Sequence, residues 1–303
     1  MTRFTAWTWS LLAAALLVAP ACSRSGRAGV RLTTFAGAVE PYLADSLNAF
    51  REAGLIVQLQ SVPGTAKAME SLLGGTADVI LGTYEQTRQL AARGKPIEAV
   101  YVLDTCHCLA LVSLKPGIRA ISDLAGRTIG VAAAGGQMQN FARHLLRKLG
   151  REASYASIGT GPSAVAALES GKVDAAVVLY GGYLALKERH AELLTLAETF
   201  TPDGMEAHLG VRAYPSKSLL AEAGWAAAHR DELNRLRRAF QRTVAWMKAH
   251  SAEEILDRLP PAARSPDRDL DLKMLQLLVP LLSLDGTVPP GSDRAVDALL
   301  RRD

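Results

Sequence analysis

Two tyrosines stand at the ends of two stretches of sequence that match each other column by column. Tyr84 ends the stretch that begins at Leu72, and Tyr180 ends the one that begins at Leu168; in both, a Gly and an Asp precede an unbroken apolar run. A tyrosine offers a flat face for stacking and a hydroxyl for hydrogen bonds. We expect Tyr84 and Tyr180 to face one another across a ligand cleft; two buried core tyrosines are the alternative.

Small and polar residues follow the other predicted strands. Thr65, Gln137 and Ser163 stand where helices begin, and free backbone N–H groups at such positions favour an anionic or strongly accepting ligand group. The same residues would serve equally as helix caps. No arginine stands directly at a predicted strand end, so bidentate hydrogen bonding of a sulfonate or nitrate by arginine is not expected. Lys67, in the first turn of its predicted helix, could provide a single positive charge instead. The residues that we predict to bind the ligand are Phe35, Gly37, Thr65, Thr83, Tyr84, Gln137, Thr160, Ser163 and Tyr180.

One short segment, Cys106, His107 and Cys108, combines residue types that commonly bind metal ions. On a strand the two thiols share one face and the imidazole points to the other, so the three cannot bind one metal without a bend. A ring closed across a single residue is strained. We therefore predict two buried inert thiols, no disulfide framework, no metal and no cofactor. His107 reaching the ligand cleft is the alternative.

Strand and helix patterns alternate from residue 30 to about residue 211, which predicts α/β lobes with mostly parallel sheets flanked by helices. Ligands of such sheets bind beyond the carboxyl ends of the strands, here in a cleft between two lobes. The predicted division is a first lobe over 30–112, a second over 113–211, and a return to the first lobe with C-terminal helices over 212–303. The return strand is expected at 207–212. Asp78 and Asp174 open their strands at the edge remote from the cleft and are predicted to be turn residues.

The first 29 residues have the pattern of an export signal. A basic start precedes an apolar stretch from Trp7 to Val18, and small residues follow up to Ala21. We predict a signal peptide over 1–21 and a linker over 22–29. Cys22, directly after Ala21, resembles the cysteine of a bacterial lipoprotein lipobox, although Ala19 stands where Leu is usual; the resemblance implies lipidation of Cys22, with ordinary cleavage near the same place as the alternative. The net charge of +4 among 303 residues is modest and no basic stripe is present, so a nucleic-acid partner is not expected.

Two segments of the second predicted lobe carry a family resemblance. The segment 121–131 (ISDLAGRTIGV) resembles the entry to the second lobe of type II periplasmic solute-binding proteins, and the segment 166–176 (AALESGKVDAA) is similar to a second signature of that group. The order and spacing are most similar to the nitrate, sulfonate, taurine and thiamine-pyrimidine binding proteins of ABC importers, over roughly residues 30 to 260.

The resemblance implies an exported, non-enzymatic protein that closes around one small molecule and delivers it to the permease of an ABC importer. We further expect a monomer, held at the membrane through the lipid on Cys22. Two alternatives stay open. One is a pyrimidine-synthase-like enzyme of the same fold that uses Cys106, His107 and Cys108 to hold iron. The other is a periplasmic sensor that presents its ligand to a membrane receptor.

Overall fold

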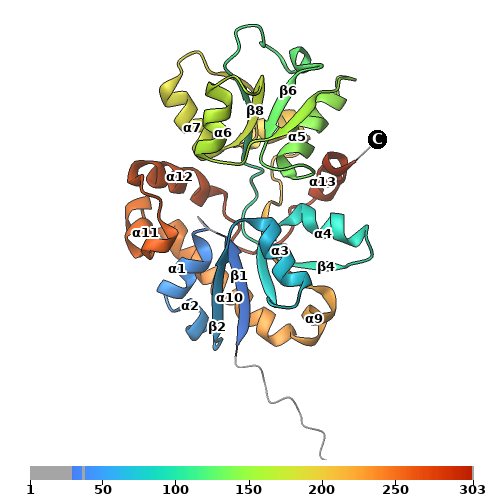
Figure 1. Ribbon diagram of the computed structural model, residues 1–303. Coiled ribbons are helices and arrows are strands. Elements are labelled where there is room, and N and C mark those ends of the chain that lie inside the picture. Colours follow the sequence, from blue (N-terminus) through green and yellow to red (C-terminus); the bar gives the residue numbers. More distant parts are fainter. Residues whose placement is uncertain (1–28, 36–37, 302–303) are drawn as a thin grey trace, which may run out of the picture.

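The computed structural model describes residues 29–35 and 38–301, which form two lobes, each built around a five-stranded sheet (Figure 1). The chain passes from the first lobe to the second between residues 102 and 109 and returns between residues 209 and 217, after helix α8 of the second lobe. The carboxyl ends of the parallel strands in each sheet lead toward the junction where these two segments lie. The predicted signal peptide, Cys22 and Gly37 fall outside the described residues.

The first sheet contains four strands in one direction and one in the other. Its spatial order is β2 (Val57–Val62), β1 (Val30–Phe35), β3 (Val79–Thr83), β10 (Lys217–Glu222) and β4 (Ile97–Val102). The return strand β10 runs antiparallel to both of its neighbours. The helices of this lobe are α1 (Glu40–Ser46), α2 (Ala49–Glu52), α3 (Thr65–Leu73), α4 (Tyr84–Ala91), α9 (Ala223–Ala228), α10 (Arg230–Ala249), α11 (Ala252–Arg258) and α12 (Arg268–Leu281), with a 3-10 turn at Pro261–Ala263.

The second sheet repeats this plan. Its spatial order is β7 (Ser154–Ser157), β6 (Thr128–Val131), β8 (Ala175–Leu179), β5 (Leu109–Ser113) and β9 (Leu194–Glu198), and β5 is the antiparallel strand. A 3-10 turn (Ile121–Leu124) and helices α5 (Gln137–Arg147), α6 (Pro162–Glu169), α7 (Tyr180–Arg189) and α8 (Pro202–Leu209) belong to this lobe. The last helix, α13 (Ser292–Leu300), packs against α5 and α4 and so joins the lobes. The predicted α/β class and mostly parallel sheets are confirmed.

Asp78 and Asp174 hold equivalent positions in the two sheets. The Asp78 carboxylate accepts a hydrogen bond from the Arg31 backbone N–H at 3.0 Å, and the Asp174 carboxylate accepts one from the Thr128 backbone N–H at 2.8 Å. Each aspartate thereby ties the start of its own strand to the start of the neighbouring parallel strand. Asp174 also pairs with Lys115, and this contact holds the pKa of its carboxyl below the usual range. The matching aspartates are structural, as their place at the strand entrance predicts.

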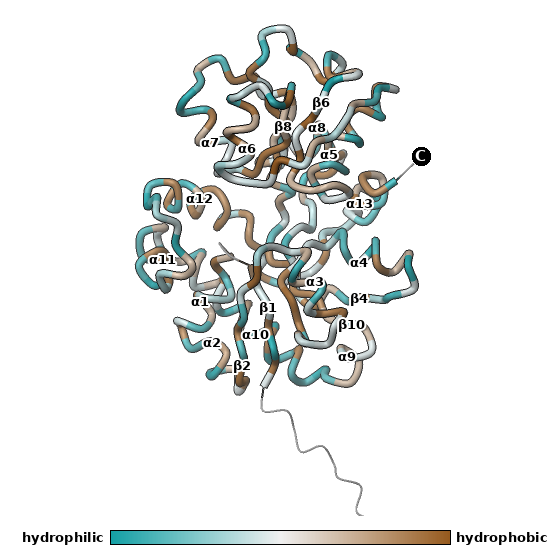
Figure 2. Tube along the Cα trace, in the orientation of Figure 1, coloured by the Kyte–Doolittle hydropathy of each residue, from teal (hydrophilic) through white to brown (hydrophobic). Residues whose placement is uncertain are grey.

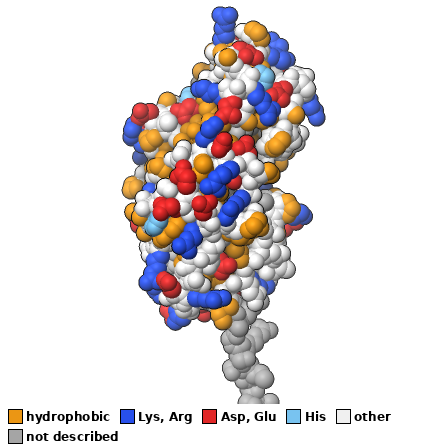
Figure 3. Space-filling view, turned by 90° about the vertical axis from the view of Figure 1, so that its left-hand side faces the viewer, with side chains coloured by type: hydrophobic (Ala, Val, Ile, Leu, Met, Phe, Trp, Pro, Cys, Tyr) orange, Lys and Arg blue, Asp and Glu red, His pale blue; other side chains and the backbone are white. Residues whose placement is uncertain are grey.

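Each lobe has its own hydrophobic core. In the first lobe, Phe240 of α10 is fully buried and its ring lies 5.8 Å from that of Phe50 and 6.2 Å from that of Tyr101. In the second, strands β5, β6 and β8 contribute fully buried residues such as Leu111, Ile129 and Ala175. Figure 2 shows the hydrophobic residues gathered along the strands in the interior of the lobes. On the face drawn in Figure 3, acidic and basic side chains are interspersed, as the modest net charge suggests.

The predicted return strand at 207–212 is wrong. Residues 202–209 form helix α8, because Pro202 fits the first helical turn and the Thr201 hydroxyl accepts a hydrogen bond from the Gly204 N–H at 2.9 Å. Gly210, at φ 73°, ends the helix in the left-handed conformation that glycine adopts readily. The strand that returns to the first sheet is β10, which begins at Lys217.

Candidate functional site at the junction of the lobes

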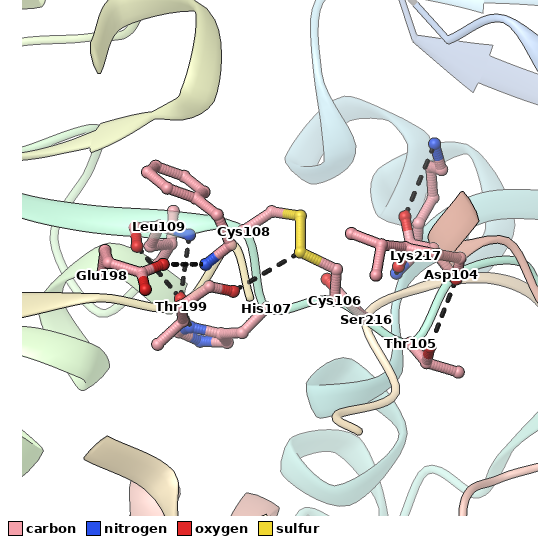
Figure 4. The surroundings of a disulfide bond; sticks show 12 residues. Asp104, Thr105, Cys106, His107, Cys108, Leu109, Glu198, Thr199, Ser216 and Lys217 are labelled. Atoms are coloured by element: carbon pink, nitrogen blue, oxygen red, sulfur yellow. Dashed lines mark hydrogen bonds and ion pairs between the residues drawn. A yellow bond between two sulfur atoms is a disulfide. The ribbon is translucent and has the colours of Figure 1, made fainter. Parts of the chain in front are cut away.

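The first crossing segment carries a disulfide bond between Cys106 and Cys108 (Figure 4). The prediction of two free inert thiols, with no disulfide, is therefore wrong. It assumed that the strand already begins at Cys106, whereas β5 begins at Leu109. Cys108 instead adopts φ 57°, in the left-handed region, and this turn brings the two Cα atoms to 5.1 Å. The disulfide closes a small ring around His107 at the point where the chain leaves the first lobe.

His107 points into a buried polar cluster that both lobes build. Its Nδ1 lies 3.2 Å from the Thr199 hydroxyl and its Nε2 lies 3.7 Å from the Glu85 carboxylate. The Tyr214 hydroxyl donates to Glu85 at 3.0 Å, and the Asn140 amide donates to it at 3.5 Å. Burial and the neighbouring Glu85 carboxylate raise the pKa of Tyr214 well above its ordinary value. Glu85 belongs to α4 of the first lobe and Asn140 to α5 of the second, so this cluster connects the lobes.

A second buried polar cluster lies on the first-lobe side of the junction. The Lys217 ammonium is 2.6 Å from one oxygen of Glu40 and 3.6 Å from one of Asp104. The Asp104 carboxylate also accepts the Lys217 backbone N–H at 3.0 Å. Burial raises the pKa of Asp104 to about 6, against the lowering effect of Lys217. Figure 4 shows Asp104 and Lys217 on one side of the disulfide and His107 with Thr199 on the other.

These two clusters were not predicted from the sequence. Their members lie far apart in the chain, up to 177 residues in the case of Lys217 and Glu40, and His107 alone among them belongs to a motif that the sequence analysis identifies. One signal was present: Asp104 and Lys217 stand next to the apolar runs of β4 and β10, where a charged residue needs a partner if it is buried. Glu40 was interpreted only as the start of a helix.

Tyr84 and Tyr180 occupy different surroundings. Tyr84 is 8% exposed, packs with the second-lobe core, and donates its hydroxyl to Asp293 of α13 at 2.8 Å. Tyr180 is half-buried, and its ring lies 4.9 Å from that of Phe200 and 6.3 Å from that of Tyr183. The ring contacts of the described residues thus pair Tyr180 with Phe200 and Tyr183 and not with Tyr84.

The Tyr84–Asp293 hydrogen bond gives a prediction for the docking of α13. Burial and this bond raise the pKa of Tyr84 to about 12, so the hydroxyl keeps its proton at neutral pH and donates to the carboxylate. Tyr84→Phe is expected to lower the free energy of unfolding by about 1.5–3 kcal/mol, because Asp293 loses a charge-assisted partner. Urea unfolding measures this loss, and faster amide exchange in α13 locates it. Tyr42→Phe is the control, since the structure shows no hydrogen bond for the Tyr42 hydroxyl within the described part of the chain, and an equal effect of both changes contradicts the prediction.

Apart from Gly37, which lies outside the described residues, the other predicted ligand residues lie near the strand ends or helix starts where the sequence places them. Gln137 begins α5, and its amide is 3.5 Å from the Ser216 hydroxyl in the second crossing segment. The Ser163 hydroxyl near the start of α6 donates to the Thr160 carbonyl at 3.0 Å, and both residues are exposed. The Thr83 N–H donates to the Gln86 side chain at 2.9 Å. Phe35 and Thr65 are half-buried, and Lys67 pairs with Glu70 at 2.6 Å on the surface of α3. Whether these residues bind a ligand stays a prediction.

Two surface cavities lie away from these residues. One of about 310 Å³ is lined by Trp246, His250 and neighbouring residues of α11. The other, of about 580 Å³, lies between residues 209–213 and 289–298. Over residues 29–35 and 38–301, no group of three or more His, Cys, Asp or Glu residues is arranged to hold a metal ion. Within the same ranges, no helix has the length and apolar character needed to cross a membrane.

Comparison with known proteins extends the likeness over most of the chain. The family model described as NMT1/THI5 like matches residues 38–254. A solved structure of a Bordetella bronchiseptica protein superposes with a TM-score of 0.79 at 25% sequence identity, over 90% of this chain and 89% of that one. No curated protein sequence matches the chain significantly.

Two further solved structures carry descriptions of a bound substrate class. The alkanesulfonate-binding protein SsuA of Xanthomonas axonopodis pv. citri superposes with a TM-score of 0.65 at 20% identity, over 90% of each chain. The periplasmic nitrate-binding protein NrtA of Synechocystis superposes with a TM-score of 0.59 at 14% identity, over 76% of this chain and 65% of that one. At these identities the likeness concerns the fold, which is that of type II periplasmic binding proteins. Because the family model matches residues 38–254, more than half of the chain, the chain belongs to the NMT1/THI5-like family.

Proposed function

We propose that the chain is the exported substrate-binding subunit of an ABC importer. It captures a small nutrient between its lobes and delivers it to a membrane permease, as a monomer anchored through a lipid on Cys22. The sulfonate- and nitrate-binding relatives of this fold, and the pyrimidine binders that the sequence resembles, suggest the classes of nutrient.

One observation carries this proposal. Two sheets of the same topology direct the carboxyl ends of their parallel strands toward one junction, and among the described residues two segments of the chain connect the sheets there. Such an arrangement allows the lobes to close on a ligand that contacts both of them. The interlobe contacts of α13 and α12, such as the ion pair between Lys273 and Glu188, lie to the side of the connecting segments (Figure 1).

Ligand capture is tested by thermal unfolding of the mature protein with a panel of sulfonates, nitrate, bicarbonate, amino-pyrimidines and short amines. A ligand at about 100 times its dissociation constant is expected to raise the free energy of unfolding by about 2.7 kcal/mol. Small-angle scattering is expected to show a smaller radius of gyration with the same compound. A panel that changes neither quantity contradicts the proposed function.

The predicted site residues are tested with the compound that stabilises most. Tyr180→Ala is expected to weaken its binding at least tenfold, because a half-buried ring next to the strand end is lost. Tyr155→Ala is the matched control, since Tyr155 is a half-buried tyrosine of the same lobe on the far edge strand β7. Equal affinities of the two variants exclude Tyr180 from the site.

The enzyme alternative depends on Cys106, His107 and Cys108 holding iron. In the structure the two sulfur atoms are bonded to each other, and His107 is directed toward Thr199 and Glu85. This geometry favours binding over iron chemistry. Iron that copurifies in stoichiometric amounts and is lost in Cys106→Ser would reverse that preference.

A further inference from the structure

Two unpartnered polar atoms lie at the carboxyl end of β1. Among the described residues, neither the Thr34 hydroxyl oxygen nor Oε2 of Glu40 has a hydrogen-bond partner, although both atoms are buried. Thr34 is fully buried and Glu40 is 2% exposed. A buried polar atom without a partner loses the hydrogen bonds that water would give it, so native structures contain few of them. Two such atoms, one near the end of β1 and one at the start of α1, are without a partner among the described residues, and a ligand group could supply their hydrogen bonds.

The two residues share one side of the first sheet. Val30 and Leu32 of β1 pack in the same hydrophobic cluster as Leu43 of α1, and Thr34 continues that face because side chains alternate along a strand. Glu40 is the first residue of α1, which packs on the same face. Both residues therefore lie at the edge of the sheet where ligands of open α/β folds bind.

The charges around Glu40 determine what can approach it. Lys217 is the one cation in the cluster, and it contacts both Glu40 and Asp104. When both carboxyls are ionised, two negative charges face one positive charge. Lys217 already occupies Oε1 of Glu40, which leaves Oε2, an acceptor only, without a donor. The carboxylates would repel an anionic ligand group at this place. A positively charged group with N–H donors would supply both the second positive charge and the hydrogen bond that Oε2 of Glu40 lacks.

From this geometry we infer that Thr34 and Glu40 form a subsite for the cationic nitrogen of the ligand, so that the captured nutrient is a small amine or a related cationic N–H donor. The inference rests on the proposed function and narrows its substrate class. The Glu40 carboxylate accepts a hydrogen bond from the N–H group of the ligand, and the Thr34 hydroxyl oxygen is a second acceptor. Lys217 and Asp104 are positioning residues that hold the Glu40 carboxylate in place.

Three small compounds separate nitrogen recognition from anion recognition. The charged group of ethanolamine is an ammonium and that of ethanesulfonate is a sulfonate, whereas taurine carries both groups. Isothermal calorimetry on the mature protein is expected to show binding of ethanolamine and taurine, with ethanesulfonate at least tenfold weaker. Binding of ethanesulfonate as tight as that of taurine overturns the subsite and leaves ligand capture intact. If no compound here or in the wider panel binds, the proposed function fails together with the subsite.

Two variants of the subsite and one control distinguish a ligand subsite from a structural role. Glu40→Gln is expected to weaken binding of the amine at least tenfold, and Glu70→Gln, on the exposed face of α3, leaves it unchanged. Thr34→Val removes a buried hydroxyl without a partner, so it is expected to leave the melting temperature unchanged or higher while it weakens amine binding at least threefold. A Thr34→Val protein that binds the amine as tightly as the unaltered protein overturns the inference.

Discussion

Lys217→Met is expected to lower the free energy of unfolding by about 3–5 kcal/mol, because it leaves two carboxylates buried without their cation. Glu40 and Asp104 are 2% and 6% exposed, and the Lys217 ammonium is the cation that contacts both. Burial already raises the pKa of Asp104 to about 6 with Lys217 in place. Urea-induced unfolding at neutral pH measures the loss.

Lys67→Met is the matched control for this change. Lys67 makes an ion pair of the same length, 2.6 Å, with Glu70, but both side chains are more than half exposed. Solvent screens such a pair, so its removal is expected to change the free energy of unfolding by less than about 1 kcal/mol. Similar losses of unfolding free energy in the two variants would contradict the prediction that burial makes the Lys217 ion pairs contribute more to stability than the exposed Lys67 pair.

Gly286→Ala is expected to cost about 3 kcal/mol or more in the free energy of unfolding, from left-handed backbone strain and overpacking together. Gly286 has φ +69°, and an added Cβ lies 2.2 Å from the ring of Tyr101, which is fully buried. The ring has little room to move, because its hydroxyl donates to the Ser283 carbonyl at 2.8 Å. The backbone carbonyl of Gly286 also accepts the Val102 N–H at 2.8 Å, so this glycine holds the segment after α12 against β4.

The control for Gly286 is Gly94→Ala. Gly94 has φ +72°, but no atom lies within 4 Å of an added Cβ. Only the left-handed strain remains, at about 1–2 kcal/mol. The difference between the two variants in chemical denaturation measures the contact with Tyr101. A Gly286→Ala protein that is no less stable than Gly94→Ala refutes the close packing described for this segment.

The local pattern of the sequence predicts the repeated architecture well. The Gly–Asp–apolar columns that end at Tyr84 and Tyr180 lead to β3 and β8, the equivalent strands of the two sheets. This works because a helix stop, a strand entrance and an unbroken apolar run are determined by neighbouring residues. The same columns predict less about Tyr84 itself, since its partner Asp293 is 209 residues away and belongs to a helix that joins both lobes.

The crossing segments are harder to predict, because their conformation depends on both lobes at once. Strand alternation misplaces Cys106 and Cys108, since it gives no reason for the left-handed turn at Cys108. The return strand is predicted too early because Val211 continues an apolar pattern, although Gly210 already ends a capped helix. The buried charges of Glu40, Asp104 and Lys217 come together only when the returning chain enters the first sheet.

The place of β10 in the middle of the first sheet has a consequence for the order in which the lobes fold. β10 lies between β3 and β4, yet more than one hundred residues separate it from them in the chain, and these include all five strands of the second sheet. The second sheet is complete once Glu198 has been synthesised, whereas in the first sheet the position between β3 and β4 stays empty until Glu222 has been synthesised. Contacts between distant segments form slowly because closing a long loop costs entropy. We therefore expect the second lobe to fold first and to bring the ends of the first lobe together, although the first lobe leads the chain.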